Sequence, residues 1–162
     1  MISKDLKKLK KLCESKHLKL SLAESCTGGL VSSSITTIAG SSNFFDSAII
    51  SYSNKAKVEL LGVNKNLILQ YGAVSEEVAL SMSKNLHRLT KSHICASITG
   101  IAGPGGGSKD KPVGTVYFSM YKKINNEIEI NNCKKLFNFK NRITIQKKSN
   151  EFLIKKLINF IY

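Results

Sequence analysis

The sequence lacks several features that mark proteins which read nucleic acids. It has no tryptophan, aromatic residues make up 7% of it, and its arginines are Arg88 and Arg142 alone among 25 basic residues. Such proteins commonly use arginine for bidentate contacts and aromatic rings for base stacking. The formal charge of +14 therefore comes from lysine, and the lysine-rich stretches follow amphipathic patterns typical of solvated helix faces. We expect no nucleic-acid partner, although this charge fits a general attraction for anionic ligands.

Cysteine and histidine are too scattered for a metal centre or a redox pair. The four cysteines have neither zinc-knuckle nor Cys-x-x-Cys spacing, and the three histidines do not pair with acids at ligand spacing. No apolar run approaches the length of a membrane span, and no signal peptide follows Met1. We therefore expect a cytoplasmic protein with reduced thiols, no metal or other cofactor, and no membrane partner.

The pattern of apolar and capping residues predicts one α/β domain. The chain has 162 residues, 42% of them hydrophobic, and no linker or repeat divides it, so we expect a single domain over residues 1–162. Ser53, Asn64 and Ser75 are expected helix N-caps. The expected strands cover 18–23, 47–52, 94–99, 113–121 and 127–139, and the main expected helices cover 4–16, 30–40, 53–61, 76–89 and 142–161. This alternation predicts a three-layer α/β/α sandwich with a mixed, mostly parallel sheet.

The stretch AESCTGG (23–29) turns from an expected strand into an expected helix. Amide N–H groups exposed at such a turn stabilise an anion, either a phosphate or a developing oxyanion. Gly28 and Gly29 carry no side chain where a ligand would approach the backbone. Ser25 and the two residues after it supply nucleophiles or hydroxyl donors. An ordinary tight turn with capping hydroxyls would explain the stretch equally well.

Two further stretches contain a serine and a lysine that could react together. Ser42 follows Gly40, and Lys57 lies about one turn into a short expected helix. A serine hydroxyl needs a base to become a nucleophile, and lysine can be that base where burial lowers its pKa. In a chain so rich in lysine, an exposed Lys57 is the ordinary alternative, and Tyr52 could equally belong to the core.

The glycine-rich loop over residues 100–112 follows an expected strand, which is where open α/β sheets bind ligands. It has neither the Gly-Lys-Ser/Thr ending of a P-loop nor the third glycine of a dinucleotide fingerprint. A flexible connector is the alternative. Arg142 points to a phosphate, because an arginine in a composition that favours lysine suggests a planar, bidentate contact.

Taken in order, the motifs resemble the C-terminal domain of the competence/damage-inducible protein A (CinA) family, the nicotinamide mononucleotide (NMN) deamidases. The matching stretches are AESCTGG (23–29), IAGSS (38–42), YSNKAK (52–57), GAVSEEV (72–78), SITGIAGPGGG (97–107) and KPVGTVYF (111–118). The resemblance covers about residues 20–120. It implies a stand-alone domain without the additional N-terminal domain of larger members.

The resemblance implies that the chain hydrolyses the carboxamide of NMN to nicotinic acid mononucleotide and ammonia without a metal, in pyridine nucleotide salvage. It also implies a homo-oligomer, a dimer or larger. The family's Ser/Lys chemistry maps onto Lys57 as the base. We prefer Ser42 as the nucleophile and place Ser25 in the oxyanion or substrate-orienting role, although both serines match motif positions. The expected contacts to this small-molecule nucleotide substrate are Tyr52, Thr99, Arg142, Thr27, Gly28 and Gly103.

The sequence departs from the family pattern near its second arginine. The family's Gly-Asp-Arg is replaced by Lys140-Asn141-Arg142, and Gln146 stands where the family has another arginine. The departure puts phosphate affinity in question but leaves the serine and lysine untouched. One alternative is therefore a nucleotide-binding module with the same pocket and no turnover. A nucleic-acid-binding protein is a second alternative, which a steep salt dependence of binding would support.

Overall fold

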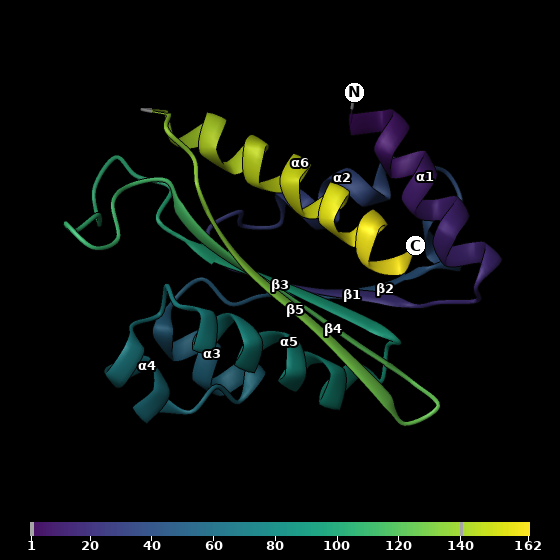
Figure 1. Ribbon diagram of the computed structural model, residues 1–162, viewed down its shortest axis with the longest axis horizontal. Helices are drawn as coiled ribbons and strands as arrows, with labels where there is room; N and C mark the ends of the chain where they lie inside the picture. Colours follow the sequence, from purple (N-terminus) through teal and green to yellow (C-terminus); the bar gives the residue numbers. More distant parts are fainter. Residues whose placement is uncertain (1, 140) are drawn as a thin grey trace.

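A computed structural model describes residues 2–139 and 141–162 of the chain, so the expectation attached to Lys140 lies outside the described residues. A five-stranded sheet forms the middle layer. Helices α1, α2 and α6 cover one face of the sheet, and α3, α4 and α5 cover the other (Figure 1). In chain order the elements are α1 (Ile2–Ser15), β1 (Leu20–Glu24), α2 (Leu30–Thr36), a short 3-10 turn (Ser41–Asn43), β2 (Phe45–Ile50), α3 (Asn54–Leu61), α4 (Lys65–Tyr71), α5 (Glu76–Thr90), β3 (Ile94–Gly100), β4 (Thr115–Ile124), β5 (Glu127–Leu136) and α6 (Arg142–Ile161).

The order of the strands in the sheet is β2-β1-β3-β4-β5. Strand β1 pairs in parallel with β2 and β3, whereas β4 pairs antiparallel with β3 and β5. β4 therefore runs against the other strands, which confirms the mixed, mostly parallel sheet of an α/β/α sandwich. Asn125 and Asn126 form the two-residue turn between β4 and β5 with φ values of 49° and 68°, as hairpin turns of type I′ require.

The side chains of β1 alternate between two apolar cores because successive residues of a strand point to opposite faces. Leu20 and Leu22 are fully buried in the larger core, which α1, α2 and α6 share with the sheet. Ala23 faces the smaller core under α3, α4 and α5. All five residues of β1 are buried, so the strand and the residue that follows it are held in a fixed position at the centre of the molecule.

Most element boundaries follow the sequence-based expectation, and the N-caps are confirmed. The side chains of Ser53, Asn64 and Ser75 each accept a hydrogen bond from a backbone amide in the first turn of their helix. The helix expected over 30–40 ends earlier, at Thr36. The strand expected from residue 113 begins at Thr115. Gly114 has a φ of 93° and its backbone packs directly on the carbonyl of Phe137, so that a side chain there would collide.

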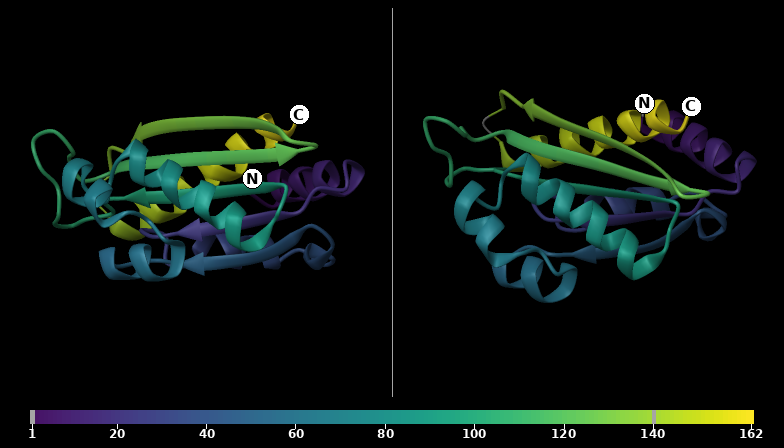
Figure 2. Two further views of the ribbon diagram at one scale, coloured as in Figure 1. Left: turned by 90° about the horizontal axis from the view of Figure 1, so that it is seen from below. Right: turned by 60° about the horizontal axis from the view of Figure 1, so that its bottom comes forward.

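The parallel strands β1, β2 and β3 direct their carboxyl ends to one edge of the sheet, which we call the carboxyl edge. Both Figure 1 and Figure 2 show the loop between β3 and β4 projecting at this edge, near α4 and the start of α6. In open α/β sheets ligands bind at this edge. None of the helices in the described part of the chain is both long and apolar enough to cross a bilayer.

Candidate active site

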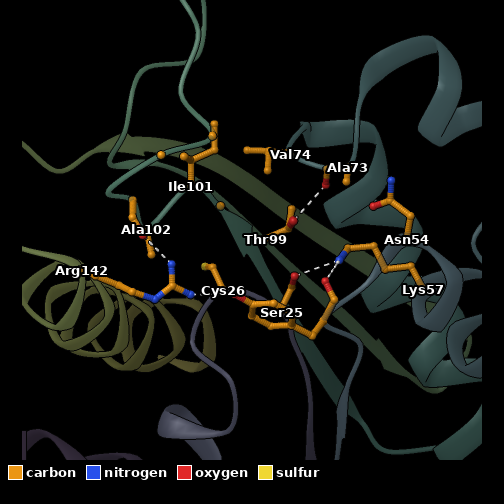
Figure 3. Close-up of a pocket in the computed structure, with 15 residues that line it drawn as sticks. Ser25, Cys26, Asn54, Lys57, Ala73, Val74, Thr99, Ile101, Ala102 and Arg142 are labelled. Atoms are coloured by element: carbon orange, nitrogen blue, oxygen red, sulfur yellow. Dashed lines mark hydrogen bonds between the residues drawn. The ribbon is translucent and has the colours of Figure 1, made fainter.

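A pocket of about 250 Å³ opens at the carboxyl edge. Its walls come from the turn after β1, the start of α3, the residues before α5, the glycine-rich loop and Arg142 (Figure 3). Lys57 and Arg142 bring positive charge to this carboxyl-edge pocket, and no aspartate or glutamate of the described chain lines it. The pocket therefore favours a ligand with an anionic group.

Ser25 and Lys57 meet in this pocket. Lys57 Nζ donates a hydrogen bond to Ser25 Oγ at 2.8 Å, as Figure 3 shows. It also donates to the carbonyl oxygen of Ser51 at 2.8 Å. Ser25 is held in place by its own amide, which donates to the carbonyl of Ile98 on β3 at 3.0 Å. Lys57 is held by α3, which begins at the Ser53 cap. A serine hydroxyl and an amine at this distance can exchange a proton.

Burial prepares Lys57 to act as a base. Its side chain is 1% exposed, and desolvation lowers its pKa from 10.5 to about 8. Loss of water disfavours the charged ammonium, and the carbonyl oxygens around it do not offset this cost. About a tenth of the amine is therefore neutral at pH 7, with more at higher pH, and only the neutral amine can take a proton from Ser25.

Cys26 lies next to Ser25 but is poorly suited to nucleophilic attack. It lines the carboxyl-edge pocket, and desolvation by burial raises its pKa to about 12. The reactive form of cysteine is the thiolate. A thiol with this pKa stays protonated at neutral pH, so the geometry favours the hydroxyl of Ser25.

Ser42 lies away from the carboxyl-edge pocket, so the preference for Ser42 as the nucleophile is corrected. It is exposed on the 3-10 turn before β2. Its carbonyl oxygen accepts a hydrogen bond from Nζ of Lys19, the residue before β1. Because β1 and β2 are parallel, the residues before them lie at the opposite edge of the sheet from Ser25 and Lys57.

Arg142 reaches the carboxyl-edge pocket from the first position of α6. Its guanidinium donates to the carbonyl oxygen of Gly103 at 2.6 Å and to the hydroxyl of Tyr52 at 2.7 Å. The structure thus brings three expected substrate contacts, Tyr52, Gly103 and Arg142, to one side of the pocket. No carboxylate of the described residues forms an ion pair with Arg142. Its charge is therefore available to an anionic ligand.

Thr99 also lines the carboxyl-edge pocket, whereas two other expected contacts do not. The hydroxyl of Thr99 donates to the carbonyl of Ala73 at 2.9 Å. Thr27 is buried and donates its hydroxyl to Glu24 at 2.6 Å, and Gly28 is outside the pocket lining. The Thr27 side chain and Gly28 therefore do not form part of the pocket wall. Their place is in the turn behind Ser25.

Sequence reasoning assigned no role to Glu24, Asn54 or Gln146. Asn54 lines the carboxyl-edge pocket. Gln146 donates from Nε2 to the carbonyl oxygen of Cys26 at 2.8 Å, so it supports the turn that carries Ser25. Glu24 is a fully buried carboxylate at the end of β1. The sequence does contain a signal for Glu24, because it is an acid directly before a strand-to-helix turn and carboxylates are stabilised near helix N-termini.

The amides of the turn are not all free to stabilise an oxyanion, as the sequence alone had suggested. Those of Ser25 and Gly28 donate to backbone carbonyls, and that of Gly29 donates to the Glu24 carboxylate. Within the described part of the chain, no hydrogen-bond acceptor is found for the amides of Cys26 and Thr27. These two remain available beside Ser25.

Comparison with known proteins gives consistent matches. The family profile described as the CinA C-terminal domain matches residues 3–161. A CinA-like protein of Prochlorococcus marinus (strain MIT 9515) is 50% identical over 131 residues, which make up 80% of this chain and 30% of that protein. A nicotinamide-nucleotide amidohydrolase PncC of Enterobacter agglomerans is 52% identical over 101 residues, 62% of each chain. The chain thus spans about 30% of the length of the CinA-like relative.

Solved structures show the same fold. The competence/damage inducible protein CihA from Agrobacterium tumefaciens has a TM-score of 0.84 at 33% identity, with 96% of this chain and 94% of that chain covered. The competence or damage-inducible protein from Enterobacter asburiae has a TM-score of 0.90 at 28% identity, with 100% and 99% covered. The architecture of this chain is therefore similar to theirs from end to end.

Proposed function

The chain belongs to the CinA C-terminal domain family, and from this premise we propose that it is an amidohydrolase that converts NMN and water to nicotinic acid mononucleotide and ammonia. The observation that carries the proposal is the buried contact of 2.8 Å between Lys57 Nζ and Ser25 Oγ. The name of the relative from Enterobacter agglomerans, a nicotinamide-nucleotide amidohydrolase, supports the choice of substrate.

In the first half of the reaction, neutral Lys57 accepts the hydroxyl proton of Ser25 while Oγ attacks the carboxamide carbon. The proton passes from Lys57 to the leaving nitrogen, the C–N bond breaks and ammonia departs. An ester then joins Ser25 to the pyridine carboxyl group. In the second half, Lys57 takes a proton from water, the oxygen of that water attacks the ester, and the proton returns to Ser25 Oγ as nicotinic acid mononucleotide leaves.

The tetrahedral intermediate carries a negative charge on the former carboxamide oxygen. The amides of Cys26 and Thr27, which are uncommitted within the described chain, are the donors we assign to it. The residue that follows a nucleophile commonly contributes such a donor. Each preorganised donor of this kind typically lowers the barrier by about 3–4 kcal/mol.

The substrate lies between Lys57 and Arg142 in this proposal. The guanidinium of Arg142 holds the phosphate, because its planar donors suit bidentate contacts with phosphate oxygens. Tyr52, whose hydroxyl is bonded to Arg142, packs against the nucleotide beside it. The hydroxyl proton of Thr99 is committed to Ala73. The oxygen of Thr99 is therefore free to accept a hydrogen bond from the carboxamide N–H.

The proposal also covers the organisation of the protein. We propose one domain over residues 1–162, without a cofactor, that acts in the cytoplasm in pyridine nucleotide salvage as a dimer or larger homo-oligomer. The family match over residues 3–161 supports the single domain, and the four free cysteines suit a reducing compartment. Sedimentation of the purified protein measures its oligomeric state.

Ammonia release from NMN tests the proposal, with Lys57→Ala and Ser25→Ala measured beside the wild type. We expect release by the wild type and by Lys55→Ala, and none by the other two variants. Lys55 is the matched control because it is an exposed lysine on the same helix. Binding of NMN by the wild type without ammonia release would instead support the nucleotide-binding module, and absence of both would reject NMN as the ligand.

A further inference from the structure

Glu24 connects the central strand to the turn that carries Ser25. It is the last residue of β1, directly before Ser25, and its side chain is fully buried. Its two carboxylate oxygens accept four hydrogen bonds, all from residues of the turn and the first turn of α2. The donors are Thr27 Oγ1 at 2.6 Å, Gly29 N at 3.0 Å, Val31 N at 3.2 Å and Ser32 N at 2.8 Å.

A carboxylate in the interior is costly unless donors replace the water that it loses. All four donors of Glu24 lie within eight positions of it. These bonds therefore fold the backbone from Glu24 to Ser32 around one anionic group. Ser25 is part of this folded segment, so the path that the carboxylate imposes on the backbone decides where Ser25 Oγ points.

Backbone hydrogen bonds to the neighbouring segments also fix the main chain of Glu24 and Ser25. Its carbonyl oxygen accepts a hydrogen bond from the amide of Ser51 at 2.8 Å, and the amide of Ser25 donates to Ile98 at 3.0 Å. Ser51 in turn provides the carbonyl that accepts from Lys57 Nζ. Hydrogen bonds thus tie both Ser25 and Lys57 to the end of β1, Lys57 through Ser51.

We propose that Glu24 is a positioning residue for the hydrolysis. Its carboxylate fixes the turn so that Ser25 Oγ meets Lys57 while the amides of Cys26 and Thr27 face the developing oxyanion. This inference rests on the proposed function. Glu24 itself does not line the carboxyl-edge pocket, and it acts on the reaction through Ser25.

The variant Glu24→Gln tests this role, because it keeps the shape of the side chain but replaces one acceptor oxygen by a donor that faces other donors. We expect a folded protein whose kcat falls about 100-fold, as is typical when a reacting group is misplaced by about 1 Å. The KM for NMN stays within about twofold, since Arg142 and Tyr52 are unchanged. The midpoint of the pH profile is also unchanged, since Lys57 remains buried.

A purely structural role would give a different result. Ser83→Ala removes a buried hydrogen bond of 2.8 Å to Ser119, on α5 and β4 away from the carboxyl-edge pocket. We expect this control to lower the melting temperature while leaving the kcat of the folded protein unchanged. Wild-type kcat in folded Glu24→Gln, or a raised KM with an unchanged kcat, would overturn the proposal.

A milder pair of variants decides the question if Glu24→Gln does not fold. Thr27→Val removes one of the four hydrogen bonds to Glu24 and keeps the size of the side chain. We expect its kcat to fall about tenfold, because a hydrogen bond to a charged carboxylate is worth more than one between neutral groups. Thr27→Ser, which retains the hydroxyl, should restore kcat. Wild-type kcat in Thr27→Val, or no recovery in Thr27→Ser, would count against Glu24.

Labelling of Ser25 by an alkyl fluorophosphonate separates this inference from the choice of substrate. The probe needs an activated serine and oxyanion donors but no nucleotide. If the wild type releases no ammonia from NMN, slower labelling in Glu24→Gln than in the wild type still supports the positioning role. Equal labelling rates in the two proteins overturn it, whatever the substrate is.

Discussion

Lys57 donates a hydrogen bond of 2.8 Å to Ser25, which lies 32 positions earlier in the chain. Both side chains are buried, at 1% and 6% exposure. The parallel pairing of β1 and β2 brings them together, since one residue follows β1 and the other follows β2. For stability alone, a well-packed apolar pair would serve at least as well in this position. The buried serine and lysine lead to the following predictions.

The first prediction separates the two serines. Ser25→Ala should lower kcat for NMN by about a thousandfold or more, because the nucleophile is lost. Ser42→Ala should leave kcat within about twofold, because Ser42 is exposed at the opposite edge of the sheet. Ammonia release under saturating NMN measures both. Inactivity of Ser42→Ala together with activity of Ser25→Ala would reverse the assignment.

The second prediction concerns the pH dependence of the reaction. The pKa of Lys57 is lowered to about 8, and the base must be neutral, so kcat/KM should rise about tenfold per pH unit below this value and level off above it. Initial rates between about pH 5.5 and 9.5 measure the profile. Lys57→Arg should be inactive throughout, because a guanidinium does not lose its proton in this range. A flat profile in the wild type would rule out Lys57 as the base.

The third prediction concerns stability. Between about pH 8 and 10.5 the amine of Lys57 is protonated in the unfolded chain but neutral in the folded one. The unfolded state then binds more protons, so the free energy of unfolding should rise with pH across this window, by of order 3 kcal/mol in total. Urea denaturation at several pH values should show this rise in the wild type relative to Lys57→Met.

Lys55→Met is the control for this stability measurement. Its side chain is 79% exposed in the structure, so its removal should change the free energy of unfolding equally at all pH values in the window. The same pH dependence in the wild type and in Lys57→Met would show that the Lys57 amine is not desolvated on folding.

The fourth prediction concerns the phosphate. Arg142→Lys should raise the KM for NMN by about tenfold or more, because a lysine cannot reproduce the planar contacts of the guanidinium. The KM for nicotinamide riboside, which has no phosphate, should change little. Steady-state kinetics with the two substrates measure the difference. Arg88→Lys, on α5, should leave both values unchanged, and an equal effect of Arg142→Lys on both substrates would argue against a phosphate contact.

The sequence alone was sufficient for the α/β class, for the three helix caps at Ser53, Asn64 and Ser75, and for Lys57, Tyr52 and Arg142 as residues worth attention. These features depend on local spacing, side-chain chemistry and motif order, which a linear chain displays directly. It did not predict the buried acceptor at Glu24, because four hydrogen bonds to one carboxylate require the three-dimensional path of the turn.

The tertiary structure alone decided which serine meets the lysine. Ser25 and Ser42 both lie in stretches that match family motifs, and neither stretch indicates at which edge of the sheet its serine lies. The direction of the strands answers this, because Ser25 follows β1 whereas Ser42 precedes β2, and the two strands are parallel. Strand direction, which non-local hydrogen bonds across the sheet determine, thus decides which of the two serines lies within reach of Lys57.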